Sequence, residues 1–345
     1  PSRVVAHRVV DTNYADGRGT LEEYEIEIGA GEDVIAFTLA VAFPSGDEPA
    51  PLLVGQTFCG NQMTFSSTDL SPAYGPDTRD PCSGGGMMMS GVQMVFGEYI
   101  GKSPLPRILD RGYAYANFYA GAVVPDAGEE GRAVLDRFPI STRGRASGAV
   151  AAWGAGYGAA LDVLEADPRI DAGRTAVYGH SRHAKSALVA GAYDTRIDAV
   201  IAHQSGTGGA ALNRLKVGES IERITKSYPH WFDPAYAKFD ADGADTTPMD
   251  QHMLLALNAP HPILLGNGRR DVWSDPNGTY RAAEGADAAY EVYGLSGLDQ
   301  SNMREINVHA EIVYYLRSGG HAINSEDWDM FLDFLDAALP VGEAP

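Results

Sequence analysis

The sequence predicts an α/β fold in which a mostly parallel sheet is covered by helices on both faces. Strand-like and helix-like stretches alternate from about residue 51 onward, which is the pattern of parallel strands joined by helical crossovers. Two β-prone stretches at 21–28 and 34–43, separated by turn residues, predict an N-terminal antiparallel hairpin. We find no repeat, low-complexity block or clear linker, and we therefore expect a single domain over residues 1–345.

The individual elements follow in a regular order. Apolar, β-prone runs predict strands at 51–58, 113–120, 175–179, 197–204, 261–267 and 311–317. Longer stretches with helical character predict helices at 147–167, 182–194, 283–290 and 326–339. Between the first two strands, the Gly- and Pro-rich stretch 71–86 is expected to be a long loop packed on the body of the domain, and it is a candidate wall of a cleft.

Composition and charge exclude several classes of protein. The chain is 44% apolar and 21% charged, which is ordinary for a soluble protein that buries a large core. It has no run of 18 apolar residues that would span a membrane. A net charge of −20 argues against nucleic acid and anionic membranes as partners. Because no H-E-x-x-H or comparable spacing occurs, we expect no metal site. We also expect a monomer.

The cysteines and the first residue bear on location. Cys59 and Cys82 are the two cysteines, and they form either one disulfide or two buried thiols, with neither alternative favoured. The chain begins with Pro1, which is consistent with removal of a signal peptide or with trimming. We expect a secreted or periplasmic protein.

The stretch AVYGHSRHAKSAL at residues 176–188 carries the main chemical signal. Gly179 ends a predicted strand, Ser181 follows two residues later, and a helix begins at once. This arrangement matches the first half of the nucleophile elbow G-x-S-x-G, with His183 in place of the second glycine. A serine before a helix is also a common N-cap, and this stretch alone leaves the two interpretations even.

Two later strand ends supply the partners that a nucleophilic serine needs. Asp271 follows the strand predicted at 261–267, and His321 follows the strand at 311–317 after two glycines. The order serine, acid, histidine is that of the α/β-hydrolases. In this interpretation His321 takes the proton of Ser181, and Asp271 orients His321. Six other histidines are expected to pack near the pocket or in the core, namely His180, His183, His203, His230, His252 and His261.

Several stretches in order between about residues 151 and 339 resemble the bacterial type of the glucuronoyl esterases, carbohydrate esterase family fifteen. They are GHSRHAKSALVAGAYD, SGTGGAAL, GESIERI, YPHWF, DQHMLLALNAP, DVWSDPNG and GGHAINSEDWDMFLDF. The resemblance implies an α/β-hydrolase fold, which is a three-layer αβα sandwich. It also implies a serine esterase without a cofactor that hydrolyses esters of (4-O-methyl-)glucuronic acid, as in lignin–carbohydrate ester links on glucuronoxylan.

The resemblance also implies roles for individual residues. The signature G-x-S-R-x-x-K falls on Gly179, Ser181, Arg182 and Lys185. It implies that Ser181 is the nucleophile, that Arg182 helps to stabilise the oxyanion, and that Lys185 holds sugar hydroxyls. Glu219 and Trp273 match positions that contact the uronic acid ring, and His321 matches the catalytic histidine. From the residues alone, Trp273 would be a core tryptophan and Lys185 a surface cation.

The sequence departs from the family pattern at two positions. Gln204 stands where many members carry a glutamate as the triad acid, and Ala184 stands where a glycine is frequent. Because an amide cannot stabilise an imidazolium by charge, we expect Asp271 to be the acid, with Asp275 in reserve. Two alternatives stay open: an esterase for acetyl or feruloyl groups, and a catalytically impaired carbohydrate-binding relative, which Gln204 makes conceivable.

Overall fold

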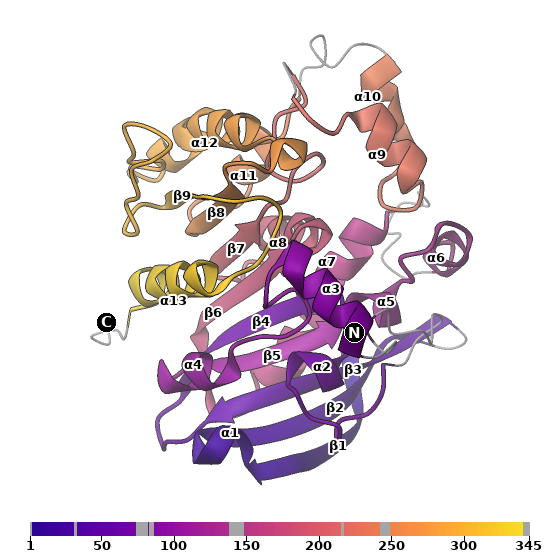
Figure 1. The fold of residues 1–345 in the computed structure, drawn as a ribbon. Coiled ribbons are helices and arrows are strands. Elements are labelled where there is room, and N and C mark those ends of the chain that lie inside the picture. The colour runs from indigo at the N-terminus through magenta and orange to yellow at the C-terminus, as the bar shows by residue number, and fades with distance from the viewer. Residues whose placement is uncertain are drawn as a thin grey trace. The chain divides into compact units, whose positions relative to one another are not determined.

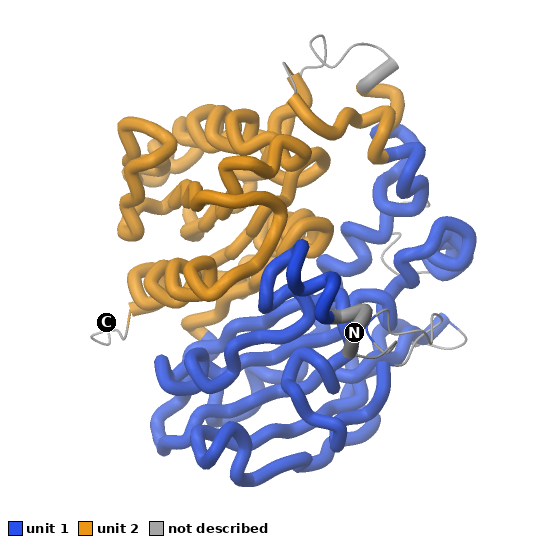
Figure 2. The backbone as a smooth tube through the Cα atoms, in the orientation of Figure 1, with its two compact units in different colours: residues 1–172, 225–236 blue, residues 173–224, 237–345 orange. Residues whose placement is uncertain are grey.

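The computed structural model describes residues 2–30, 33–73, 82, 86–137, 148–214, 217–241 and 249–340. The chain divides into two compact units, residues 1–172 with 225–236 and residues 173–224 with 237–345 (Figure 2). Each unit has its own strands and helices, and the single domain expected over 1–345 stays a prediction.

The first unit is built on five strands, which lie in the order β1-β2-β3-β5-β4 (Figure 1). They are β1 (Ser2–Asn13), β2 (Gly19–Ala30), β3 (Asp33–Pro44), β4 (Ala50–Thr57) and β5 (Ala114–Tyr119). Strands β2 and β3 pair antiparallel along their whole length, which confirms the predicted hairpin. Strand β1 was not predicted, and it adds an antiparallel edge strand to β2. On the other side, β3 pairs antiparallel with β5, and β5 pairs parallel with β4.

In the described part of the first unit, seven helices lie wholly within it: α1 (Tyr14–Gly17), α2 (Asn61–Thr64), α3 (Gly86–Phe96), α4 (Leu105–Asp110), α5 (Ala120–Val123), α6 (Gly128–Leu135) and α7 (Ala149–Leu164). The long helix α7 is rich in alanine and glycine, and this composition lets it pack closely. A Cβ on Gly156 would lie 2.5 Å from the ring of Phe118 on β5. Within this unit Cys59 and Cys82 form a disulfide with 5.3 Å between their Cα atoms. Most of the predicted loop 71–86 lies outside the described residues, and its place beside a cleft stays a prediction.

The second unit is built on parallel strands that lie side by side in chain order. They are β6 (Ile170–His180), β7 (Ala199–His203), β8 (Ile263–Gly268) and β9 (Ile312–Arg317). Nearly all residues of β7, β8 and β9 are buried, as is typical of parallel strands covered by helices. The predicted strands at 175–179, 197–204, 261–267 and 311–317 are thereby confirmed.

Among the described residues, five α-helices and one short 3₁₀-helix lie within the second unit: α8 (Arg182–Tyr193), α10 (Lys238–Ala241), α11 (His252–Ala256), η3 (Val272–Ser274), α12 (Pro276–Glu291) and α13 (Ser325–Ala338). Helix α9 (Ile221–Ser227) and the 3₁₀-helix η1 (Pro234–Ala237) each have residues in both units. Helix α12 begins at Pro276, seven residues before the predicted start, because Asp275 caps it. Among the described helices, none is long and apolar enough to cross a membrane. Since the strands are parallel, the segments that follow β6, β7, β8 and β9 all leave the sheet at one edge.

Candidate active site

Ser181 lies on a sharp turn between β6 and α8. Its backbone has φ 57° and ψ −120°, a left-handed conformation that is strained for a residue other than glycine. The turn also needs a glycine at position 179, because a Cβ there would lie 2.1 Å from the carbonyl oxygen of His183. Ser181 makes no side-chain capping hydrogen bond to α8, which argues against the N-cap interpretation. The local geometry is therefore that of a nucleophile elbow.

The start of α8 offers positive potential next to Ser181. Backbone N–H groups of the first helical turn and the helix dipole favour a negative charge at this point. Arg182, which is half-buried, is the first residue of the helix. These groups are suited to an oxyanion that develops on an acyl group attached to Ser181.

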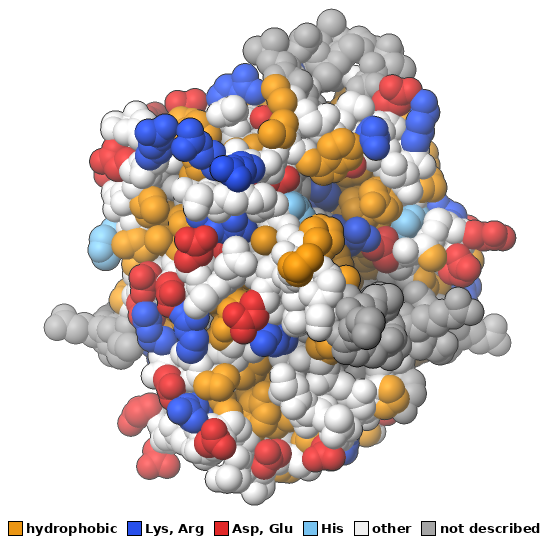
Figure 3. Space-filling view, viewed as in Figure 1, with side chains coloured by type: hydrophobic (Ala, Val, Ile, Leu, Met, Phe, Trp, Pro, Cys, Tyr) orange, Lys and Arg blue, Asp and Glu red, His pale blue; other side chains and the backbone are white. Residues whose placement is uncertain are grey.

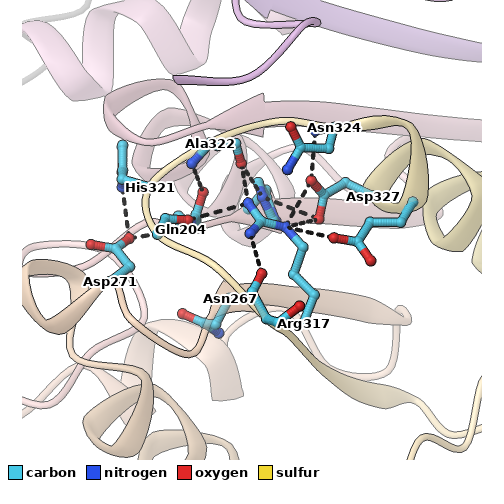
Figure 4. Close-up of polar contacts among 12 residues, drawn as sticks. Gln204, Asn267, Asp271, Arg317, His321, Ala322, Asn324 and Asp327 are labelled. Carbon is cyan, nitrogen blue, oxygen red and sulfur yellow. Dashed lines mark hydrogen bonds and ion pairs between the residues drawn. The ribbon is translucent and has the colours of Figure 1, made fainter. Parts of the chain in front are cut away.

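His321 and Asp271 form a hydrogen-bonded pair at the ends of β9 and β8 (Figure 4). Nδ1 of His321 lies 2.7 Å from Oδ2 of Asp271. The imidazole packs against the ring of His180, the residue before Ser181, with 4.7 Å between the ring centroids. The structure thus brings three segments together that lie far apart in the sequence.

Asp275, the reserve candidate for the acid, has a different place. Its Oδ1 accepts a hydrogen bond from the N–H of Gly278 at 2.9 Å, and it caps helix α12. The structure therefore places Asp271, and not Asp275, against His321.

The surroundings of Asp271 favour its charged form. Burial raises the pKa of this carboxyl, but the hydrogen bond and charge interaction with His321 lower it, as do the bonds from Ser274. The net result is a pKa below the usual value. Burial also lowers the pKa of His180 well below its usual value, and the nearby His321 adds to this effect. At neutral pH we therefore expect an ionised Asp271 and a neutral His180, on either side of His321.

Gln204, which follows β7, connects the two residues of the pair. Its Nε2 donates to Oδ2 of Asp271 at 3.1 Å and to the carbonyl oxygen of Gly320 at 2.9 Å. Its Oε1 accepts from the N–H of Ala322 at 3.0 Å. The amide thus binds the acid and both chain neighbours of His321 (Figure 4).

A buried ion pair holds the segment that carries His321. Arg317 ends β9, and its Nε donates to both carboxylate oxygens of Asp327, at 2.7 and 2.9 Å. The same guanidinium donates to the carbonyl oxygens of Gly320 at 3.3 Å and Ala322 at 2.5 Å. The sequence did not indicate this role of Arg317, because its contacts with the segment of His321 are with backbone carbonyl oxygens, which have no sequence signature.

Glu219 and Trp273 lie on two segments that touch through their backbones. The N–H of Glu219 donates to the carbonyl oxygen of Trp273 at 3.3 Å, and a Cβ on Gly218 would lie 2.3 Å from the carbonyl oxygen of Val272. Trp273 is 46% exposed, so it is not a core residue, and the guanidinium of Arg223 lies 4.7 Å from its ring centroid. Contact of Glu219 or Trp273 with a sugar stays a prediction.

Lys185 lies one turn into α8 from Ser181 and is buried rather than exposed. Its Nζ donates to the carbonyl oxygen of Ser205, which follows β7. The surface position that the residue type alone favours is therefore wrong. Its contact with sugar hydroxyls stays a prediction. Among the described residues, no three His, Cys, Asp or Glu side chains are grouped to hold a metal ion.

Comparison with known proteins identifies the family. A model of the family described as "Glucuronyl esterase, fungi" matches residues 90–294, which is more than half of the chain. A carbohydrate esterase from an unknown prokaryotic organism is 34% identical over 336 residues, which cover 94% of this chain and 77% of that protein. The chain belongs to the glucuronoyl esterase family.

Solved structures agree with this assignment to the glucuronoyl esterases. A promiscuous esterase of carbohydrate esterase family 15 from a marine bacterial metagenome has a TM-score of 0.79 and 32% identity, covering 98% of this chain and 86% of that one. The glucuronoyl esterase of Solibacter usitatus has a TM-score of 0.80 and 28% identity over the same shares. This glucuronoyl esterase is therefore of the bacterial type, has the α/β-hydrolase fold, and is a carboxylic ester hydrolase.

A fungal relative is more distant. The 4-O-methyl-glucuronoyl methylesterase of Hypocrea jecorina is 26% identical over 275 residues, which cover 76% of this chain. The aligned region spans 57% of the length of that fungal protein.

Proposed function

We propose that this glucuronoyl esterase hydrolyses esters of 4-O-methyl-glucuronic acid through a covalent intermediate on Ser181. The observation that carries the proposal is the strained turn at Ser181 next to the hydrogen-bonded pair of His321 and Asp271. The fungal 4-O-methyl-glucuronoyl methylesterase supports the choice of sugar and ester.

In the proposed reaction, Oγ of Ser181 attacks the carboxyl carbon of the ester while Nε2 of His321 takes its proton. The oxyanion of the tetrahedral intermediate is stabilised by Arg182 and by backbone N–H groups at the start of α8. His321 then gives the proton to the departing alcohol. In the second half, His321 takes a proton from water as the water attacks the acyl carbon. The second tetrahedral intermediate then breaks its bond to Oγ of Ser181, His321 returns the proton to Oγ, and glucuronate leaves. Asp271 remains a carboxylate and stabilises the imidazolium in both halves.

Three further residues are proposed to select the sugar. Lys185 donates hydrogen bonds to the hydroxyl groups of the sugar, and Glu219 accepts hydrogen bonds from them. Trp273 offers an exposed ring on which the sugar can pack. A ligand without these hydroxyls would not gain those hydrogen bonds, which disfavours a simple acetate ester. Figure 3 shows acidic side chains spread over the visible face with basic ones between them. The net charge of −20 does not oppose the substrate, because the reacting carboxyl is esterified and uncharged.

The biological setting is also proposed. We propose that the substrates are lignin–carbohydrate esters on glucuronoxylan and that the enzyme acts as a monomer outside the cytoplasm. The disulfide between Cys59 and Cys82 supports an oxidising compartment.

The test is hydrolysis of benzyl glucuronate beside a simple acetate ester. We expect the wild type to favour the glucuronate ester and Ser181→Ala to be inactive while it retains its circular dichroism spectrum. Ser45→Ala, on an exposed serine between β3 and β4, is the matched control and should keep full activity. Activity on the acetate alone would move the substrate to another esterase class. Inactivity on both esters would favour a carbohydrate-binding relative.

A further inference from the structure

We infer that Gln204 is a positioning residue. It holds the carboxylate of Asp271, the triad acid that follows β8, in place against His321. The inference rests on the proposed function of Ser181, His321 and Asp271. It assigns a role to the residue whose amide, by sequence alone, suggests a broken triad.

Both donors and the oxygen of the Gln204 amide make hydrogen bonds. Its two N–H donors bind Oδ2 of Asp271 and the carbonyl oxygen of Gly320, and its oxygen accepts from Ala322. The residue is 1% exposed, so that water does not replace these bonds. The amide therefore links the acid to the backbone on both sides of His321.

The backbone around Gln204 is held as firmly as its side chain. Gln204 has φ 54°, and its N–H donates to the carbonyl oxygen of Gly266 on β8 at 2.7 Å. The backbone of Gly268 packs closely against the amide of Gln204, because a Cβ on Gly268 would lie 2.9 Å from Nε2 of Gln204. These contacts restrict the side chain of Gln204 to a conformation in which its amide faces Asp271.

An ionised glutamate at this position would have no donor for either Asp271 or Gly320. It would place a second carboxylate beside that of Asp271, and like charges at such a distance raise the pKa of the pair. Other charged or titratable groups around the pair come from the neighbouring elements: His180 on β6, His183 on α8, His203 on β7, Arg317 on β9 and Asp327 on α13. Gln204→Glu adds a charge to this set, whereas Gln204→Met removes the hydrogen bonds without adding one.

The experiment measures kcat, KM and the pH profile with benzyl glucuronate. We expect Gln204→Met to lower kcat about 10- to 100-fold with little change in KM, because a small misplacement of His321 mainly affects the chemical step. We expect Gln204→Glu to move the acidic limb of the kcat/KM profile to higher pH by about one unit, because the added carboxylate favours the imidazolium.

Gln300 provides the matched control. It is also buried in the second unit, and its amide donates to the carbonyl oxygens of Glu305 and Tyr314 and accepts from the N–H of Tyr314 at 2.7 Å. Gln300→Met should lower the melting temperature as Gln204→Met does but leave kcat unchanged. Equal kcat losses in the two variants, or an unchanged kcat in Gln204→Met, would overturn the inference. If Gln204→Glu does not fold, Gln204→Met and Gln204→Asn still decide it. Inactivity of the wild type would instead refute the proposed function.

A cavity in the second unit carries an independent inference. It has a volume of about 280 Å³, and its lining includes Val217, Val272, Asp275, Arg269 and Arg304. The carboxylate of Asp275 is buried and accepts hydrogen bonds from the N–H groups of Gly278 and Val217, so the exposed charges of the lining are the two arginines. Val217 stands two residues before Glu219, and Val272 stands one residue before Trp273. The cavity therefore adjoins the two segments that are proposed to contact the sugar.

The two arginines of the cavity are exposed, and neither has a carboxylate partner among the described residues. In the same unit Arg196 and Arg317 each pair with an aspartate, at 2.7 Å. We propose that the cavity binds a second, unesterified uronate of the polysaccharide, because guanidinium groups bind carboxylates through paired hydrogen bonds. This proposal also rests on the proposed function.

The test compares benzyl glucuronate with a benzyl-esterified oligosaccharide that carries a second, free glucuronate. We expect Arg269→Gln and Arg304→Gln to raise KM for the acidic oligosaccharide roughly 3- to 10-fold and to leave the small ester unaffected, as befits a partly exposed ionic contact. Arg270→Gln, on an exposed neighbour outside the cavity lining, is the control. Equal effects of all three variants, or none, would refute the site, whereas wild-type inactivity on both esters would refute the proposed function.

Discussion

The carboxylate of Asp271 lies 2.7 Å from Nδ1 of His321, although 50 residues separate the two in the chain. They meet because β8 and β9 are parallel neighbours and end at the same edge of the sheet. A proton on Nδ1 that is directed at the carboxylate makes Nε2 the basic nitrogen, which is the tautomer that a nucleophilic serine needs. This relationship is the basis for the first two predictions.

Asp271→Asn should lower kcat on benzyl glucuronate by about 10³- to 10⁴-fold with little change in KM, because the amide loses the charge that stabilises the imidazolium. Steady-state kinetics of the purified variant measure this effect. Asp275→Asn is the matched control: asparagine caps a helix about as well as aspartate, so kcat should be nearly unchanged. The opposite pattern would make Asp275 the acid.

The stability of the fold should depend on pH through the same carboxyl. The pKa of Asp271 is lower in the folded protein than the usual value of about 3.9. The ionised group therefore contributes stability above that usual pKa, and this contribution is lost as the pH falls through the lower, folded value. Urea unfolding should show a gap between wild type and Asp271→Asn at pH 7 that narrows below roughly pH 4. A gap of constant size would contradict the lowered pKa.

Gly179→Ala should disrupt the turn at Ser181. The added Cβ would lie 2.1 Å from a backbone carbonyl oxygen, which cannot move as the end of a flexible side chain can. We expect a loss of about 3 kcal/mol or more in the free energy of unfolding, together with a loss of activity. In Gly91→Ala the new Cβ meets no atom within 4 Å, and this variant of α3 should be no less stable than the wild type. An active, stable Gly179→Ala would show that the turn tolerates a side chain.

Much of the fold could be predicted because buried parallel strands appear in the sequence as continuous apolar runs. Strands β7, β8 and β9 follow this rule, and the predicted boundaries differ from the observed ones by a few residues. Strand β1 escaped prediction because it lies at the edge of the sheet and is largely exposed, with apolar and polar residues mixed along it. The start of α12 was missed because Asp275 and Pro276 favour a turn as much as a helix cap.

The residues of the candidate site also include some that the sequence predicted and some that it did not. Ser181, Asp271 and His321 were predicted from a motif and from their order at strand ends, and the structure brings the last two into contact. Gln204 and Arg317 could not be assigned from the sequence, because both act on the carbonyl and N–H groups of residues 320 and 322. Any residue type supplies such backbone groups, so that only the folded chain reveals the contact.

The ion pair of Arg317 and Asp327 gives the last prediction. Both side chains are almost fully buried, with exposed fractions of 2% and 0%. Arg317→Met should lower the free energy of unfolding by about 3–5 kcal/mol, because it leaves the charge of Asp327 unpaired in the interior. It should also lower kcat, since the carbonyl oxygens beside His321 lose a donor.

Arg196 pairs with Asp194 in the same unit, but their side chains are 34% and 22% exposed. Arg196→Met should therefore cost at most about 1 kcal/mol, because water screens and replaces a partly exposed ion pair. Arg317→Lys keeps the charge, but its three donors lie on one nitrogen and do not span the acceptors that Nε and Nη2 of Arg317 reach as separate atoms. It should therefore fall between the two methionine variants in stability and in kcat. Urea unfolding of the three variants measures the order. If Arg317→Met proves as stable as Arg196→Met, the buried pair does not hold the segment of His321, and the position of that histidine depends on Gln204 instead.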